Sequence, residues 1–299
     1  MKLLLHGKKF SKEVGNQINT FVNDMIQRNI EIIYTKSFFN LLEKRINQHN
    51  NKKKTTITSL YKDNDSIDFL VCFGGDGTIL DAVTIVKNTE IPIIGINTGR
   101  LGFLATISKN EIPLLMTDLF NKKYTLSNRT LLQIEVQNNH LNFPFALNEI
   151  SVSSKENSSM INVKVFIDDE YLNTYWADGL IISTPTGSTG YSLSCGGPIV
   201  MPESNNFIIT PIAPHNLNVR PLIINDNSIV RIEIVDTNNT RKFLLSMDSR
   251  NEYFNKDCSI VLKKADFKIK LLKLESTTYS KTIRNKLLWG LDSRSYEKG

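Results

Sequence analysis

A continuous apolar run that ends in two glycines constrains the fold of this chain most strongly. Residues Asp68–Phe73 are apolar after the first position and are followed at once by Gly74–Gly75. A short run without polar alternation is typical of a strand buried on both faces, as in a parallel sheet. Residues Thr78–Val86 then have helical character, and Ile91–Ile96 form a second apolar run. A strand, a turn, a helix and a strand make a βαβ unit, so we predict an α/β fold here.

The preceding segments continue this alternation of helices and strands. Apolar residues spaced as on one helix face predict a helix over Phe10–Ile26. Residues Glu31–Tyr34 are typical of a strand, and Phe38–Ile46 of a short helix. We therefore predict an N-terminal α/β domain over residues 1–123, Rossmann-like and with a mostly parallel sheet.

From about Tyr124 the pattern changes to many short β-rich segments separated by turn residues such as Asp168–Asp169. The predicted strands are Leu131–Val136, Ile161–Ile167, Gly179–Ser183, Ile229–Val235, Arg241–Met247, Ser259–Leu262 and Phe267–Leu272. Many short strands predict an all-β domain of the sandwich or barrel type over residues 124–274. A final helical stretch, Tyr279–Trp289, could cap either domain.

Composition limits the class of protein. The hydrophobic share of 40% and the charged share of 22% are ordinary for a globular chain of 299 residues. No window approaches the roughly 18 continuous apolar residues of a membrane span. The first ten residues become basic too soon for a secretory signal, so we expect a cytoplasmic protein with no membrane partner. Cys72, Cys195 and Cys258 lie far apart, which argues against disulfides and a zinc site.

The charge pattern is mildly basic without a nucleic-acid signature. The net charge is +6, and Lys and Arg are spread along the chain apart from one run at Lys52–Lys54. Such a run is usually a solvated loop, so we predict no nucleic-acid partner. A mildly basic protein suits anionic substrates such as nucleotides.

The loop Gly74–Thr78 is the first candidate site. It follows a predicted buried strand, where open α/β sheets place their ligands. Glycines let the backbone approach a phosphate, and the next helix N-terminus offers N–H donors. A carboxylate repels phosphate, so Asp76 is explained if it accepts a proton from an attacking hydroxyl or organises a metal ion. The alternative is a plain turn in which Asp76 is a helix N-cap. The sequence has no GxxxxGK[ST], no GxGxxG after a predicted strand and no GxSxG.

A second candidate stretch, Asp178–Pro198, runs from an apolar strand into a cluster of Ser, Thr and Gly with one tyrosine. Hydroxyls and free backbone N–H groups bind ribose, amide or phosphate oxygens, and Tyr191 offers a flat face to a base. The alternative is a Ser/Thr-rich turn without a ligand.

Taken together, these motifs resemble one family. The matching segments are Gly74–Gly77, Gly95–Leu104, Asn148–Glu149, Asp178–Gly179, Thr184–Thr189, Gly196–Pro198, Pro214–His215 and Arg220–Leu222. In order and spacing they are similar to those of bacterial NAD kinases over nearly the whole chain. GGDG alone is also found in diacylglycerol, sphingosine and phosphofructo-kinases, whereas the ordered set is specific.

The resemblance implies an activity and its partners. ATP would donate its γ-phosphoryl group to the 2′-hydroxyl of the adenosine ribose of NAD, giving NADP, with a divalent metal ion, most commonly Mg²⁺. The chain would form a homodimer or homotetramer, place its site between the two domains and return residues 275–299 to the first domain. The remaining alternatives are a lipid kinase of the diacylglycerol type and a non-catalytic dinucleotide-binding sensor.

The resemblance also implies roles for individual residues. Asp76 would be the catalytic carboxylate, Asn148 would meet an adenine edge and Glu149 a ribose diol. The phosphate loop is Gly74, Gly75, Gly77 and Thr78. The NAD-contacting set is Asp76, Gly77, Asn148, Glu149, Asp178, Thr189, Gly190, Tyr191, Ser192, Leu193, Ser194 and Arg250. We assign no metal-ligating residue.

Four positions bear on how closely the family pattern is followed. Gly190 stands where Ala is common, and Arg250 where Gln is often found. Trp176 replaces a polar or basic residue, and His215 either approaches a phosphate or is structural.

Overall fold

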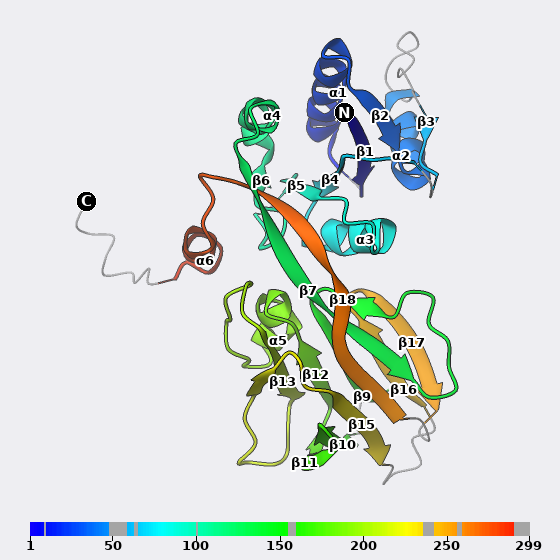
Figure 1. Cartoon of the computed structure of the whole chain (residues 1–299), viewed down its shortest axis with the longest axis vertical. Coiled ribbons are helices and arrows are strands. Elements are labelled where there is room, and N and C mark those ends of the chain that lie inside the picture. The colour runs from blue at the N-terminus through cyan, green and yellow to red at the C-terminus, as the bar shows by residue number, and fades with distance from the viewer. Residues whose placement is uncertain are drawn as a thin grey trace, which may run out of the picture. The chain divides into compact units, whose positions relative to one another are not determined.

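A computed structural model describes residues 1–8, 10–47, 59–62, 65–99, 101–154, 160–235, 242–255 and 259–289. The Lys52–Lys54 run, Arg100 and Cys258 lie outside the described residues. The chain divides into two compact units (Figure 1). Unit 1 comprises Met1–Ser127 and Lys270–Gly299, and unit 2 comprises Asn128–Ile269.

Unit 1 is built on a parallel sheet in the order β3-β2-β1-β4-β5. Its strands are β1 (Lys2–Gly7), β2 (Glu31–Tyr34), β3 (Ser59–Leu60), β4 (Phe69–Gly74), β5 (Ile93–Asn97) and β6 (Ile107–Ser108), which pairs with β5. Its helices are α1 (Lys12–Gln27), α2 (Lys36–Asn47), α3 (Asp76–Val86), the 3-10 turn η1 (Lys109–Glu111), α4 (Ile112–Phe120) and α6 (Tyr279–Leu287). The predicted α/β class with a mostly parallel sheet is confirmed.

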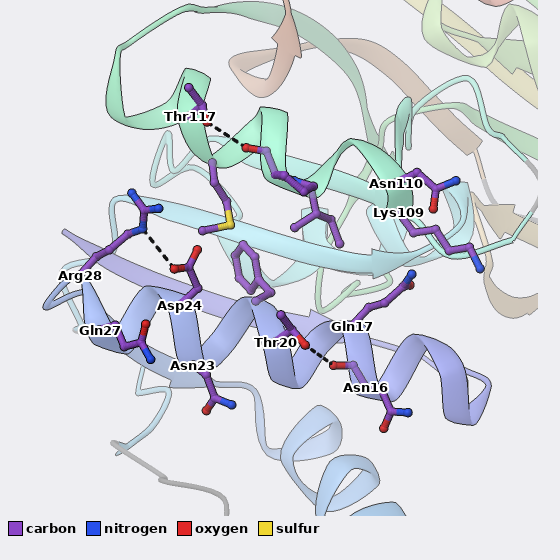
Figure 2. Close-up of a pocket in the computed structure, with 14 residues that line it drawn as sticks. Asn16, Gln17, Thr20, Asn23, Asp24, Gln27, Arg28, Lys109, Asn110 and Thr117 are labelled. Carbon is purple, nitrogen blue, oxygen red and sulfur yellow. Dashed lines mark hydrogen bonds and ion pairs between the residues drawn. The ribbon is translucent and has the colours of Figure 1, made fainter.

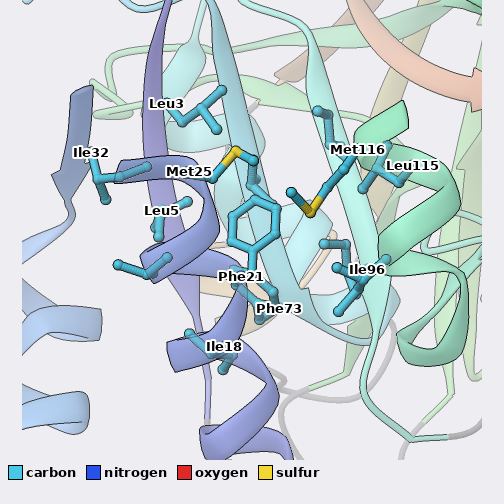
Figure 3. Packing of buried hydrophobic residues seen from close by; sticks show 14 of the residues in the cluster. Leu3, Leu5, Ile18, Phe21, Met25, Ile32, Phe73, Ile96, Leu115 and Met116 are labelled. Carbon is cyan, nitrogen blue, oxygen red and sulfur yellow. The ribbon is translucent and has the colours of Figure 1, made fainter. Parts of the chain in front are cut away.

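The core of unit 1 lies where α1 and α4 cover the sheet (Figure 3). Ser11 caps α1 by accepting a hydrogen bond from the Val14 amide at 3.3 Å. The apolar face of α1 then buries Phe21, whose ring meets the Phe73 ring of β4 edge-on at 5.6 Å. Burying a side chain of this size contributes roughly 1.5–3 kcal/mol, so this packing fixes the strand that carries the glycine loop.

Unit 2 contains two antiparallel sheets whose apolar faces form one core. One has the order β11-β10-β15-β18, with β7 paired to β18 and β8 paired to β7; the other has the order β14-β13-β12-β9-β16-β17. The strands are β7 (Tyr124–Val136), β8 (Phe145–Ala146), β9 (Glu149–Ser154), β10 (Ile161–Ile167), β11 (Glu170–Ala177), β12 (Gly179–Ser183), β13 (Asn206–Ile212), β14 (Leu222–Asn225), β15 (Val230–Val235), β16 (Lys242–Met247), β17 (Arg250–Asn255) and β18 (Ser259–Leu274). The 3-10 turn η2 (Thr186–Thr189) and the short helix α5 (Tyr191–Ser194) follow β12. The predicted β-rich C-terminal class is confirmed.

The core of unit 2 follows from alternation along its strands. In β10, Ile161, Val163 and Val165 are buried while the residues between them are partly exposed. Their partners in the core include Leu180 and Ile182 of the other sheet. One apolar face on each sheet is the pattern of a β-sandwich.

One strand prediction was wrong. Residues Ser259–Leu274 form the single strand β18, where the sequence predicted two shorter strands with a break before Phe267. Lys263 and Lys264, which lay outside both predicted strands, pair with Glu135 at 2.6 Å and Asp226 at 2.9 Å. The buried positions change phase here, from Ile260 and Leu262 to Ala265 and Ile269, and the strand continues through this change.

Three further features complete the comparison with the sequence. The turn at Asp168–Asp169 is a hairpin between β10 and β11, with positive φ at both residues, as a tight two-residue turn requires. Strand β1 and helix α4 were not predicted, and neither were strands β3, β6, β9, β11, β13, β14 and β17. None of the helices among the described residues is long and apolar enough to span a membrane.

Candidate active site

The glycine loop of unit 1 lies where three parallel strands end together. Gly7 of β1 is in register with Phe73 of β4, and Gly74 of β4 is in register with Asn97 of β5. The carboxyl ends of parallel strands are where α/β sheets bind ligands. The loop after β4 therefore lies between two other segments. Lys8 follows β1 on one side, and Thr98 follows β5 on the other.

A pocket of about 320 Å³ opens at this edge. It is lined by Lys8, Gly74, Gly75, Gly77, Thr78, Asn97, Thr98 and Gly99. Gly74 is required by packing, since a Cβ there would lie 2.1 Å from the Thr78 Oγ1. A Cβ at Gly75 or Gly77 would meet nothing within 4 Å. The loop backbone at these two glycines is therefore open to a ligand.

Asp76 is the first residue of α3, and its carboxylate is anchored by a loop. Oδ2 accepts a hydrogen bond from the Phe103 amide at 2.8 Å. Oδ1 accepts from the amides of Leu104 at 3.0 Å and Ala105 at 2.9 Å. The alternative of Asp76 as an N-cap is wrong, because Gly75 holds that position.

Gly102 allows this arrangement. A Cβ at Gly102 would lie 1.9 Å from the Asp76 Oδ1, so no other residue fits without moving the carboxylate. Lys286 of α6 donates to the Leu101 carbonyl at 2.5 Å and so contacts the same loop. The position of Asp76 is thus set by residues distant in sequence.

In unit 2, the candidate pair Asn148–Glu149 lies at the start of β9 and is held by Asp248. The Asp248 carboxylate accepts backbone hydrogen bonds from Leu147 at 2.9 Å, Asn148 at 2.8 Å and Glu149 at 3.3 Å. Burial raises the pKa of Asp248. The hydrogen bonds from these amides and the charge of Arg250 lower it and so partly offset the rise. Sequence reasoning did not assign this role to Asp248.

The side chains of the pair present two hydrogen-bond acceptors. Burial, with a smaller contribution from the Asp248 charge, raises the pKa of Glu149 to about 7. Its Oε2 accepts from the Tyr191 amide at a long 3.4 Å. The Asn148 Oδ1 is buried and has no hydrogen-bond partner among the described residues. Buried acceptors without strong donors are costly, so a ligand with N–H and O–H donors would suit them.

The Ser/Thr-rich segment packs directly on this pair. The Thr184 hydroxyl donates to the Leu147 carbonyl at 2.6 Å. A Cβ at Gly187 would lie 2.0 Å from the Asn148 carbonyl oxygen, and one at Gly190 would lie 2.6 Å from the Glu149 Oε2. Glycine at 187 is thus required for the close approach of η2 to the strand.

The remaining predicted contacts differ in accessibility. Tyr191 and Ser194 are exposed, and Thr189 is half-buried. Burial raises the pKa of Tyr191, with smaller contributions from the charges of Cys195 and Asp178. Ser192 is buried, and its hydroxyl is bonded to that of Thr210 at 2.8 Å, which gives it a structural contact.

Arg250 and Trp176 depart from the family pattern, and His215 had two possible roles. All three contact other groups of the protein. Arg250 donates to the Phe143 carbonyl at 2.6 Å and also to that of Phe145. The Trp176 and His215 rings lie 5.0 Å apart, and the His215 amide donates to the Trp176 carbonyl at 2.8 Å.

A larger pocket of about 790 Å³ lies between α1 and α4 (Figure 2). Its lining is mainly amide and hydroxyl side chains around the apolar residues Phe21 and Met116. The charged residues in it are paired, Arg28 with Asp24 at 3.4 Å and Lys109 with Glu13 at 2.7 Å. It has neither the glycine loop nor the carboxylates of the candidate site.

An α/β unit with an open glycine loop and a sandwich unit with buried acceptors are together the architecture of a two-domain nucleotide-binding protein. Family models match in both parts, the ATP-NAD kinase N-terminal domain over residues 8–124 and the ATP-NAD kinase C-terminal domain over residues 147–274. The chain belongs to the NAD kinase family.

Individual relatives agree over the full length. The chain is 43% identical to an NAD kinase of Christiangramia forsetii and 44% identical to one of Flavobacterium psychrophilum, each over 99% of this chain and 100% of the relative. An NAD kinase of Archaeoglobus fulgidus in complex with ATP has a TM-score of 0.70 at 25% identity, over 97% of this chain and 98% of that one. Yeast NADH kinase complexed with NADH shares the fold with a TM-score of 0.86 at 24% identity, over 98% of this chain and 88% of that one.

Proposed function

We propose that this protein is an ATP-dependent NAD kinase, which transfers the γ-phosphoryl group of ATP to the 2′-hydroxyl of the adenosine ribose of NAD. The observation that carries the proposal is the pair of acceptors at the start of β9. The Asn148 Oδ1 has no partner among the described residues, and Glu149 has a pKa raised to about 7. Adenosine offers the matching donors, an amino group on the base and two hydroxyls on the ribose.

In this assignment unit 2 supplies the NAD-binding residues. Asn148 accepts from the adenine amino group, and the ionised Glu149 accepts from the ribose hydroxyls. The exposed Tyr191 ring stacks on a base, and Asp178 accepts from an amide or amino group of the dinucleotide. Thr189, Gly190, Leu193 and Ser194 supply the surrounding contacts.

Unit 1 supplies the carboxylate that takes the proton. The 2′-oxygen forms a bond to the γ-phosphorus as the bond to the β–γ bridging oxygen breaks and ADP leaves. Asp76 accepts the hydroxyl proton. An alcohol is a far weaker acid than a carboxylic acid, so this transfer accompanies or follows attack. Oδ2 accepts only one of the three anchoring hydrogen bonds, and a carboxylate oxygen can accept two.

A divalent metal ion, Mg²⁺ by family resemblance, belongs to this proposal. Among the described residues no three His, Cys, Asp or Glu side chains gather as a metal site. Mg²⁺ is commonly held by substrate phosphates, waters and one or two carboxylates, so the donor set fits an ion that arrives with ATP. Such an ion would neutralise the charge that develops on the phosphates. Asp76 is the carboxylate within the glycine loop Gly74–Thr78.

A coupled assay tests the proposal. ATP and NAD are incubated with the protein, and NADP is read with an NADP-specific dehydrogenase. Formation of NADP supports an NAD kinase, whereas phosphate that appears only in lipid would indicate a lipid kinase. NAD binding without turnover would indicate a sensor. We further propose a cytoplasmic location. We also propose self-association as a homodimer or homotetramer, and sedimentation velocity measures this oligomeric state.

A further inference from the structure

The pocket at the glycine loop has one charged side chain among the described residues that line it, and that side chain is Lys8. Lys8 follows β1 directly, next to the strand that ends in Gly74. The other lining residues are glycines and neutral polar residues, and they contribute backbone N–H groups, hydroxyls and one amide. This mixture suits a phosphate chain better than a base or a sugar, because it has no apolar surface to cover a ring.

The glycines indicate where the chain of phosphates would lie. A Cβ at Gly75, Gly77 or Gly99 would meet nothing within 4 Å, and none of the three has a positive φ. Neither packing nor backbone conformation therefore requires glycine at these positions. Close approach of a ligand to the backbone is the remaining physical reason for glycine.

Lys8 forms an exposed ion pair with Asp81, and a ligand can replace Asp81 in this pair. Its Nζ lies 2.6 Å from the Oδ2 of Asp81, which is on α3. The Lys8 side chain is 53% exposed, and an ion pair this exposed contributes little to stability. A phosphate carries more charge than one carboxylate, so it can replace Asp81 as the partner of the ammonium group.

We propose that Lys8 binds the phosphate chain of the donor in this pocket, exchanging Asp81 for phosphate. This inference rests on the proposed kinase function and adds a donor contact to it. The ammonium group would balance donor charge near Gly75 and Gly77 without touching NAD. Lys8 is therefore a substrate-binding residue for the donor.

Steady-state kinetics on three variants test this proposal. Lys8→Gln should raise the KM for ATP about 10- to 100-fold, the usual value of a charge-assisted hydrogen bond, and leave the KM for NAD unchanged. Asp81→Asn removes the competing carboxylate and should not raise the KM for ATP. Lys12→Gln, an exposed lysine at the start of α1, is the matched control and should change neither constant.

The outcomes separate this proposal from the function on which it rests. An unchanged KM for ATP in Lys8→Gln, or an equal rise in Asp81→Asn, would overturn the donor contact while leaving the kinase intact. If the wild-type protein makes no NADP, direct binding of inorganic tripolyphosphate by calorimetry still tests the pocket. Binding about tenfold or more weaker in Lys8→Gln than in Lys12→Gln supports the contact, and equal binding refutes it.

Discussion

Replacing Glu149 by Gln should stabilise the ligand-free protein while weakening NAD binding. The pKa of Glu149 is raised from 4.5 to about 7, first by burial and then by the charge of Asp248. A raised carboxyl pKa means that the folded state disfavours the ionised form, so stability is lost as pH rises from the unfolded to the folded pKa. A shift of roughly 2.5 units corresponds to about 3 kcal/mol.

Gln removes this cost because it is neutral at every pH and has nearly the same shape. Its oxygen can still accept from the Tyr191 amide, and a neutral amide is not repelled by the Asp248 charge. Above pH 7 the free energy of unfolding should rise by about 3 kcal/mol, which is roughly 6–12 °C in Tm for a unit of this size. Below about pH 4.5 the two proteins should have equal stability.

Thermal melts of the wild type and Glu149→Gln at steps from pH 5 to pH 8 measure the effect. The exposed Glu170→Gln is the matched control and should follow the wild type. The KM for NAD should rise at least tenfold in Glu149→Gln and lose its pH dependence near 7, because two ribose hydroxyls lose an anionic acceptor. A difference in Tm that does not change with pH would refute the buried-carboxylate reasoning.

Three other substitutions have defined outcomes. Asp76→Asn should lower kcat by about 10²- to 10⁴-fold, because the variant lacks the proton acceptor. It should also destabilise the protein by about 1–3 kcal/mol, since the new amide NH₂ faces one of the three anchoring N–H groups. Near-wild-type turnover would contradict the role of Asp76 as the base. Gly102→Ala should displace the Asp76 carboxylate and lower kcat with the KM for NAD retained, and an active variant would show that this anchoring is dispensable. Asn148→Ala should raise the KM for NAD about tenfold or more without loss of Tm, because it removes a buried acceptor that lacks a protein partner; an unchanged KM would remove Asn148 from the adenine site.

The parts of the fold that local patterns determine were predictable from the sequence. The run before Gly74 predicts the buried strand β4, and the apolar spacing over Phe10–Ile26 predicts α1. The hairpin at Asp168–Asp169 follows from residues that tolerate positive φ. Each of these signals lies within a few consecutive residues, so pattern reasoning can read it.

Elements whose stability depends on distant partners were not predictable in this way. The charged residues inside β18 lay outside both predicted strands, but Lys263 and Lys264 pair with Glu135 and Asp226, which are far away in sequence. Strand β1 was missed because its apolar run is short and was considered only as a secretory signal. Tertiary packing overrides local preference in β18, whereas β1 follows its local apolar pattern and was overlooked.

The site shows the same division. The motifs located Asp76, Asn148 and Glu149, but not the groups that hold them. Asp248 anchors the start of β9 from about 100 residues away, and Gly102 makes room for a carboxylate 26 residues before it. Lys8 became a candidate only once strand register placed it beside Gly74.

The most direct measurement is the product of a reaction containing ATP and NAD, identified by its phosphorus NMR spectrum as well as by an NADP-specific dehydrogenase. The account predicts one new phosphomonoester on the 2′-oxygen of the adenosine ribose, formed by the wild type and nearly absent with Asp76→Asn. A product phosphorylated at any other position, or none at all under conditions in which NAD binds, would contradict it.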